Sequence, residues 1–171
     1  MSRFSFLFCL APILLFGSIG GFFYAYSVSV MQGLDSLPEI EAIHAMQKLN
    51  QGTRNMVFLF TFLVTPLFTL GCAAVLYLSG RQTAGLLLLA AVMVYFLGSF
   101  LPTVNINVPM NHVLEALDPA KILPSEAPEI WRRFHQDWTF WNTVRAVMAL
   151  IALMFSGLAM YSLPRDSAQP G

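Results

Sequence analysis

The sequence is short of charge. Only 11% of its 171 residues are Asp, Glu, Lys or Arg, against 57% that are hydrophobic, whereas a soluble domain typically carries about 25% charged residues. A surface that faces water needs more ionic groups, so the composition excludes an ordinary soluble domain. Nine basic and nine acidic residues give a net charge of zero, and this lack of basic excess argues against a nucleic-acid partner.

Long uncharged runs separate the few charges, at residues 4–34, 55–80, 82–114 and 146–164. About 20 apolar helical residues cross the hydrocarbon core of a bilayer, and a helix satisfies its backbone hydrogen bonds internally. The first run is longer than the apolar region of a signal peptide and no cleavage site follows it, so we expect it to remain as a helix. We therefore expect a single membrane domain, 1–171, with four transmembrane helices at roughly 5–31, 55–79, 84–104 and 139–163.

Two long connections, 32–54 and 105–138, then share one membrane face, opposite the short turn at 79–83. We expect an all-α fold, namely a four-helix transmembrane bundle with short capping helices in the two long loops on one membrane face. Basic and acidic residues both gather in these loops, so the distribution of Lys and Arg leaves the membrane orientation open.

The first long connection is expected to contain a helix. Ser36-Leu37-Pro38-Glu39 matches a capping box with proline in the first turn. At 100° per residue, Gln47 and Asn50 fall on the same face as the apolar residues of this helix. Two amides on a packed face need hydrogen-bond partners, which are either structural or supplied by a ligand in a polar pocket.

The second long connection is rich in asparagine. Asn105, Asn107, Pro109 and Asn111 follow the third apolar run. Asparagine favours helix caps, and proline suits the first helical turn. We expect the third span to end here and a capped short helix to follow, with contact to a ligand as the alternative for the asparagines.

One charge falls inside an apolar span. We expect the last helix to start near Glu126 and to continue into the fourth span, which places Trp138, Trp141 and Arg145 within a stripe of about 100°. An unpaired charge inside a membrane is costly. Arg145 therefore either extends to the lipid headgroups or faces a polar cavity and meets an anionic or oxygen-bearing ligand.

Metal-ligand patterns are missing. No two of His44, His112 and His135 have the i,i+3 or i,i+4 spacing of a ligand pair. Cys9 and Cys72 lie inside predicted spans, where a free cysteine behaves as a small hydrophobe. We expect neither a metal nor another cofactor.

Several segments resemble one family. The stretches at 21–27 and 45–50, the Asn-x-Pro-x-Asn segment at 107–111 and the Trp-x-x-Trp-Asn-x-x-Arg segment at 138–145 look like the bacterial branch of the anthrone-oxygenase-like family of small four-span membrane proteins. Fungal members are associated with oxidising polyketide anthrones to anthraquinones with O₂ and without an evident cofactor. The resemblance implies a multi-pass protein of the cell membrane, in bacteria the inner membrane.

Residues and resemblance together predict a pocket under the capping helices. The first hypothesis is a cofactor-independent oxygenase for a phenolic or quinone-type aromatic substrate; the alternative is a non-catalytic membrane protein that binds a lipid or quinone or stabilises a partner complex. The expected partners are the bilayer and a hydrophobic small molecule, and the oligomeric state is open. His112 and His135 are the candidate bases. The expected catalytic residues are Arg145, Asn107 and Asn111, and the expected substrate-binding residues are Trp138, Trp141, Asn142, Gln47 and Asn50.

Overall fold

A computed structural model describes residues 3–163, and over that range all regular structure is helical. Four of its helices are long and apolar enough to span a membrane: Ser5–Asp35, Met56–Leu78, Gln82–Glu115 and Ala127–Tyr161. The chain is thus an all-helical, multi-pass membrane protein, as the uncharged runs predicted. Residues 1–2 and 164–171 of the expected domain lie outside the described residues.

Two of the long helices change register along their length. The first consists of α1 (Arg3–Ala25), the π-helical turn η1 (Tyr26–Val30) and α2 (Met31–Asp35). The third consists of α5 (Gln82–Tyr95), the π turns η2 (Phe96–Phe100) and η3 (Thr103–Asn107), and α6 (Val108–Glu115). The second and fourth are α4 (Met56–Leu78) and α7 (Ala127–Tyr161).

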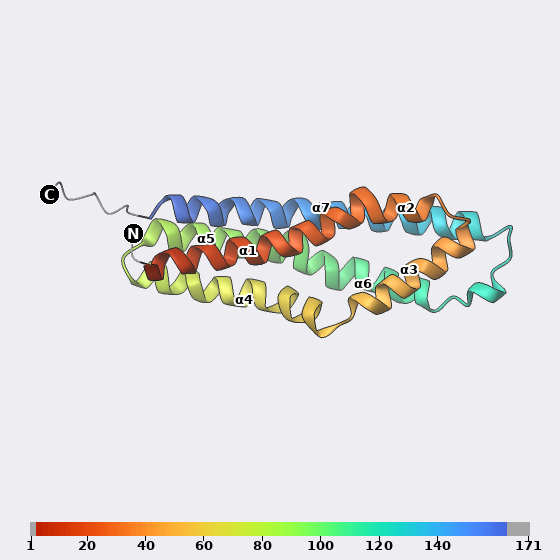
Figure 1. The fold of residues 1–171 in the computed structure, drawn as a ribbon, viewed down its shortest axis with the longest axis horizontal. Helices are drawn as coiled ribbons and strands as arrows, with labels where there is room; N and C mark the ends of the chain where they lie inside the picture. The colour runs from red at the N-terminus through yellow and green to blue at the C-terminus, as the bar shows by residue number, and fades with distance from the viewer. Residues whose placement is uncertain (1–2, 164–171) are drawn as a thin grey trace.

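The helices form an elongated bundle (Figure 1). The start of α1, the α4–α5 turn and the end of α7 lie at one end, and α2, α3 (Glu39–Thr53) and α6 lie at the other. A short 3-10 turn, η4 (Pro119–Lys121), connects α6 to α7. At the α4–α5 turn, Gly80 has a positive φ of 80°, a conformation that glycine adopts without steric cost.

Three expectations about helix ends are wrong. The third helix does not end near 104 but continues to Glu115, and Asn107 makes no side-chain cap at the start of α6. The π turns η2 and η3 flank Pro102, and η3 ends just before Val108-Pro109. Proline lacks an N–H and crowds the carbonyl four residues earlier, so a local change of register lets the helix continue. Ser36 does not cap α3 either, because its hydroxyl donates to the carbonyl of Gly33 at 2.7 Å.

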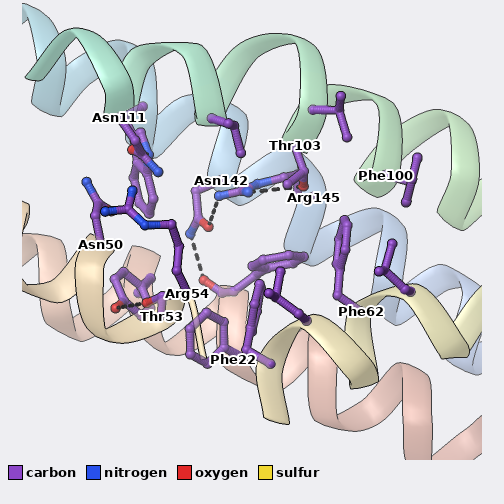
Figure 2. Close-up of a pocket in the computed structure, with 18 of the residues that line it drawn as sticks. Phe22, Asn50, Thr53, Arg54, Phe62, Phe100, Thr103, Asn111, Asn142 and Arg145 are labelled. Atoms are coloured by element: carbon purple, nitrogen blue, oxygen red, sulfur yellow. Dashed lines mark hydrogen bonds between the residues drawn. The ribbon is translucent and has the colours of Figure 1, made fainter. Parts of the chain in front are cut away.

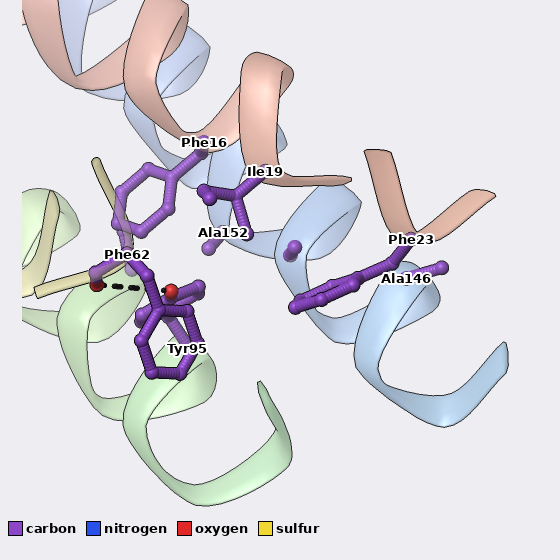
Figure 3. Close-up of a cluster of buried hydrophobic side chains, with 9 residues drawn as sticks. Phe16, Ile19, Phe23, Phe62, Tyr95, Ala146 and Ala152 are labelled. Carbon is purple, nitrogen blue, oxygen red and sulfur yellow. Dashed lines mark hydrogen bonds between the residues drawn. The ribbon is translucent and has the colours of Figure 1, made fainter. Parts of the chain in front are cut away.

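Small residues let α1 pack closely on α7. Phe16, Ile19 and Phe23 of α1 pack against buried alanines of α7, including Ala146 and Ala152, as Figure 3 shows. Tyr95 of α5 completes this core, and its hydroxyl donates to the backbone carbonyl of Phe62 at 3.3 Å. Because this layer is apolar and filled, it forms a floor beneath the polar end of the bundle.

Candidate functional site

A cavity of about 280 Å³ lies above this floor. It is enclosed by α1 and η1, the end of α3, the start of α4, the η2–α6 region and α7. Figure 2 shows Asn50, Arg54 and Asn111 on one side, Phe22, Phe62 and Phe100 on the other, and Asn142 and Arg145 between them. The cavity is mostly aromatic and aliphatic, with a few convergent polar groups, which is typical of a small-molecule site.

Arg145 is the buried charge of this cavity. Only 4% of the residue is exposed. Its Nη2 donates to Oδ1 of Asn142 at 2.7 Å and its Nη1 donates to Oγ1 of Thr103 at 3.1 Å, while Nε has no partner among the described residues. The guanidinium carbon lies 4.4 Å from the ring centre of Phe23 and 5.4 Å from that of Trp138. Arg145 therefore points into the bundle and does not extend to the headgroups.

Among the described residues, no carboxylate balances this charge. The ion pairs found within residues 3–163 do not include Arg145, and no Asp or Glu is among the described residues that line the cavity. Hydrogen bonds to neutral oxygens and ring faces offset part of the cost of desolvation. The net positive charge nevertheless remains available to a ligand.

Asn142 holds Arg145 in position. Its Nδ2 donates to the carbonyl of Phe23 and to Oγ of Ser27, both at 2.7 Å, and this fixes Oδ1 toward the guanidinium. Asn142 is fully buried. Because one amide links α7 to both α1 and Arg145, the direction of the guanidinium is set before any ligand binds.

Each of the three π turns contributes a hydroxyl to this arrangement. Ser27 of η1 accepts from Asn142, Ser99 of η2 donates to the backbone carbonyl of Arg145 at 2.7 Å, and Thr103 of η3 accepts from the guanidinium. π turns inside α-helices occur frequently at functional sites. Their convergence on one turn of α7 is the strongest structural indication that this end of the bundle is a site.

Five of the residues predicted from sequence line the cavity: Asn50, Asn111, Trp138, Asn142 and Arg145. Nε1 of Trp138 donates to Oδ1 of Asn111 at 2.7 Å, which fixes both side chains. Asn50 is 94% buried, and its Nδ2 has no partner among the described residues. Two buried donors, Nε of Arg145 and Nδ2 of Asn50, therefore lack a hydrogen-bond partner among the described residues.

Three predicted residues lie outside the lining of the cavity. Gln47 donates to the backbone carbonyls of Leu114 and Leu117, both at 2.9 Å, so the structural alternative holds for this amide. Asn107 donates to the carbonyl of Trp138 at 3.2 Å and ties η3 to α7. Trp141 packs edge-on against Phe140. The change of register in η2 and η3 turns Thr103, and not Asn107, toward Arg145.

Sequence reasoning missed other lining residues. Thr103, Tyr26 and Thr53 supply hydroxyls, and the last two contact each other at 3.3 Å. Arg54 lines the cavity where α3 ends, and its Nη1 lies 2.7 Å from Oε1 of Glu115. This ion pair could not be predicted from the sequence, because Arg54 and Glu115 are 61 residues apart and no local pattern connects them.

The histidines are dispersed. His112 is exposed and lines the cavity, His44 is exposed on α3, and His135 packs against Trp131. Within residues 3–163, no group of three or more His, Cys, Asp or Glu side chains is placed to hold a metal ion. Of the two candidate bases, His112 alone borders the cavity in the described part of the chain.

The family is established by comparison. A family model described as anthrone oxygenase matches residues 54–155, which is more than half of the chain. Neither a search of curated proteins nor a search of solved structures gives a match. The chain belongs to the anthrone oxygenase family.

Proposed function

We propose that this member of the anthrone oxygenase family is a membrane-embedded oxygenase that acts on a phenolic or quinone-type aromatic substrate, with O₂ and without a metal or organic cofactor. The observation that carries the proposal is the buried, uncompensated Arg145 in an aromatic cavity. We place the protein in the cell membrane, as in the inner membrane of a bacterium, because its four spans require a bilayer.

A flat substrate fits the chemistry of the lining. Phe22, Phe58 and Phe62 offer ring faces on one side, and Trp138 offers a ring held in place by Asn111. The oxygen-bearing edge of the substrate would accept hydrogen bonds from the free donors of Arg145 and Asn50. In this proposal Gln47, Asn107 and Trp141 act by positioning the helices and not by touching substrate.

The reaction needs charge stabilisation more than a cofactor. An anthrone carries a methylene group opposite its carbonyl; loss of one methylene proton gives an enolate with the negative charge on oxygen. The enolate carbon bonds to O₂, and scission of the O–O bond leaves one oxygen as a new carbonyl while the other leaves as water. The methylene and O₂ thus give a carbonyl and water, and four electrons pass to oxygen. Arg145 would stabilise the enolate oxygen in this mostly apolar cavity.

The proton acceptor in this mechanism is assigned to His112. His112 is the one imidazole at the cavity among the described residues, and it lies at the exposed edge. From there it would accept the methylene proton and pass it to solvent. This sparse supply of bases is the observation that favours a second candidate, a membrane protein that binds a quinone or related aromatic lipid without turnover or stabilises a partner complex.

Oxygen uptake separates the two candidates. Purified protein in lipid nanodiscs is given 1,8-dihydroxyanthrone, and O₂ consumption and quinone absorbance are followed against protein-free nanodiscs, because the probe oxidises slowly by itself. The oxygenase predicts one O₂ per quinone at a rate well above the protein-free rate and unchanged by a chelator. Saturable quenching of tryptophan fluorescence with no added O₂ uptake would instead establish the binding protein.

A further inference from the structure

The cavity has an opening on the side of the bundle. Leu59 and Leu63 of α4 and Val104 and Val108 of the third helix line the cavity and are also exposed; Leu63 and Val104 are each 48% exposed. A side chain that borders a cavity and also the outer surface marks the rim of an opening. Within residues 3–163, α4 packs along α1 and α5 but makes at most marginal contact with η3 or α6.

This opening faces lipid. Leu59 and Leu63 lie about 4.5 Å and 10 Å along the axis from the start of α4 at Met56, in a helix whose outer surface is apolar. The neighbouring exposed side chains of α4, Phe60 and Leu67, are also apolar. A molecule dissolved in the hydrocarbon core therefore meets aliphatic side chains at the rim of this opening.

The water-facing side has the opposite chemistry. Nη1 of Arg54 donates to both carboxylate oxygens of Glu115, at 2.7 and 2.8 Å, and so bridges the end of α3 to the end of α6. An apolar molecule that entered from water would have to displace this ion pair and pass the exposed His112. Desolvating charged groups costs free energy, so an apolar ligand meets a higher barrier when it enters from water than when it enters from lipid.

We propose that the cavity exchanges its ligand directly with the bilayer, through the opening between α4 and the η3–α6 segment. The ligand is therefore a lipid-dissolved aromatic molecule that is apolar over most of its surface and carries oxygen at one edge. It enters with that edge toward Arg145, and the Arg54–Glu115 pair stays closed during exchange. The inference rests on the proposed function only in taking the cavity to hold such a ligand.

The test narrows the opening without touching the polar end. Leu63→Phe and Val104→Phe add bulk at the rim, and Leu67→Phe is the matched control, since Leu67 is exposed on the next turn of α4 but does not line the cavity. The probe is 1,8-dihydroxyanthraquinone, supplied in phosphatidylcholine vesicles to protein in nanodiscs. Stopped-flow quenching of tryptophan fluorescence gives its association and dissociation rates.

If the ligand exchanges directly with the bilayer, both rim variants should slow association and dissociation by about tenfold or more. Kd should stay within about threefold, and Leu67→Phe should behave as the wild type. Glu115→Ala, which removes the ion pair without changing a residue that lines the cavity, should leave the rates unchanged. Wild-type rates in both rim variants, or a large acceleration in Glu115→Ala, would overturn the route. Slowed exchange without anthrone turnover would refute the oxygenase and keep the route. Intact turnover with unslowed exchange would refute the route alone, and absence of quenching in the wild type would overturn both.

Discussion

Replacement of Arg145 gives the sharpest test of the site. In Arg145→Met the side chain keeps its reach but loses the charge and the hydrogen bonds to Asn142 and Thr103. A hydrogen bond to a charged group contributes about 1.5–3 kcal/mol, and each 1.4 kcal/mol is a factor of about ten. Affinity for an anionic or oxygen-bearing ligand should fall by about 10- to 100-fold, and turnover by about 100- to 1,000-fold if the guanidinium stabilises an enolate.

The bundle should survive this change. Methionine leaves Asn142 and Thr103 each short of a donor, at a cost of about 1–3 kcal/mol, but it also removes a buried charge that no carboxylate neutralises. The two effects oppose each other, so melting in detergent should shift little. Arg145→Lys should recover little activity, because a compact ammonium cannot reach two acceptors as the planar guanidinium does.

The assay is anthrone-dependent O₂ uptake in nanodiscs, with fluorescence titration for affinity and thermal unfolding for stability. Arg132→Met is the matched control, because Arg132 is an exposed arginine of the same helix, paired with Glu129 away from the cavity. Full activity in Arg145→Lys, or unchanged affinity and turnover in Arg145→Met, would refute the reasoning. A collapse of stability in Arg145→Met would show that its role is structural.

Four further outcomes are expected. Asn142→Asp should weaken binding of the anthraquinone probe about tenfold or more, measured by fluorescence titration, because a carboxylate would pair with the guanidinium and neutralise the charge that binds the probe's oxygen atoms; tighter binding would contradict this. Gln47→Ala should lower stability by about 1–3 kcal/mol, since two buried carbonyls lose a donor, and should leave probe affinity nearly unchanged in the folded protein. In a background without native cysteines, Gln51→Cys and Thr83→Cys should react with a membrane-impermeant reagent from opposite sides; labelling from one side would exclude the four-span topology. Elemental analysis should find well under one iron, copper or zinc per chain, and a stoichiometric metal would refute the cofactor-free proposal.

The spans could be predicted because the signal is local. A membrane helix must be apolar over its whole length, so uncharged runs locate it, and α4 at Met56–Leu78 matches the expected 55–79 within a residue at each end. The start of the last helix could be predicted as well, since α7 begins at Ala127, next to the expected Glu126. For Arg145 the sequence left two alternatives open, the lipid headgroups or a polar cavity, and the structure shows the inward direction.

The partners of these residues could not be predicted. Helical periodicity assumes 100° per residue, and the π turns η2 and η3 break that assumption before and within the asparagine-rich segment. As a result Thr103 reaches Arg145, whereas Asn107 reaches a backbone carbonyl. Gln47 illustrates a second limit, because its acceptors lie 67 and 70 residues away and no local pattern distinguishes a structural amide from a ligand-binding one.

Residue 142 is an asparagine and not an aspartate, and this difference leaves the positive charge of Arg145 in place. A buried arginine with a carboxylate partner would be neutralised within the protein, and an anionic ligand would have to compete with that partner. Asn142 orients the guanidinium through one carbonyl oxygen, and its own position is set by Phe23 and Ser27. The guanidinium is thus held in a fixed direction, as it would be in an ion pair, but its positive charge is not neutralised. Apolar residues of similar volume would avoid the cost of the buried charge altogether, so keeping the charge accords with the proposed function, in which the negative charge or oxygen edge of a ligand would complete the arrangement.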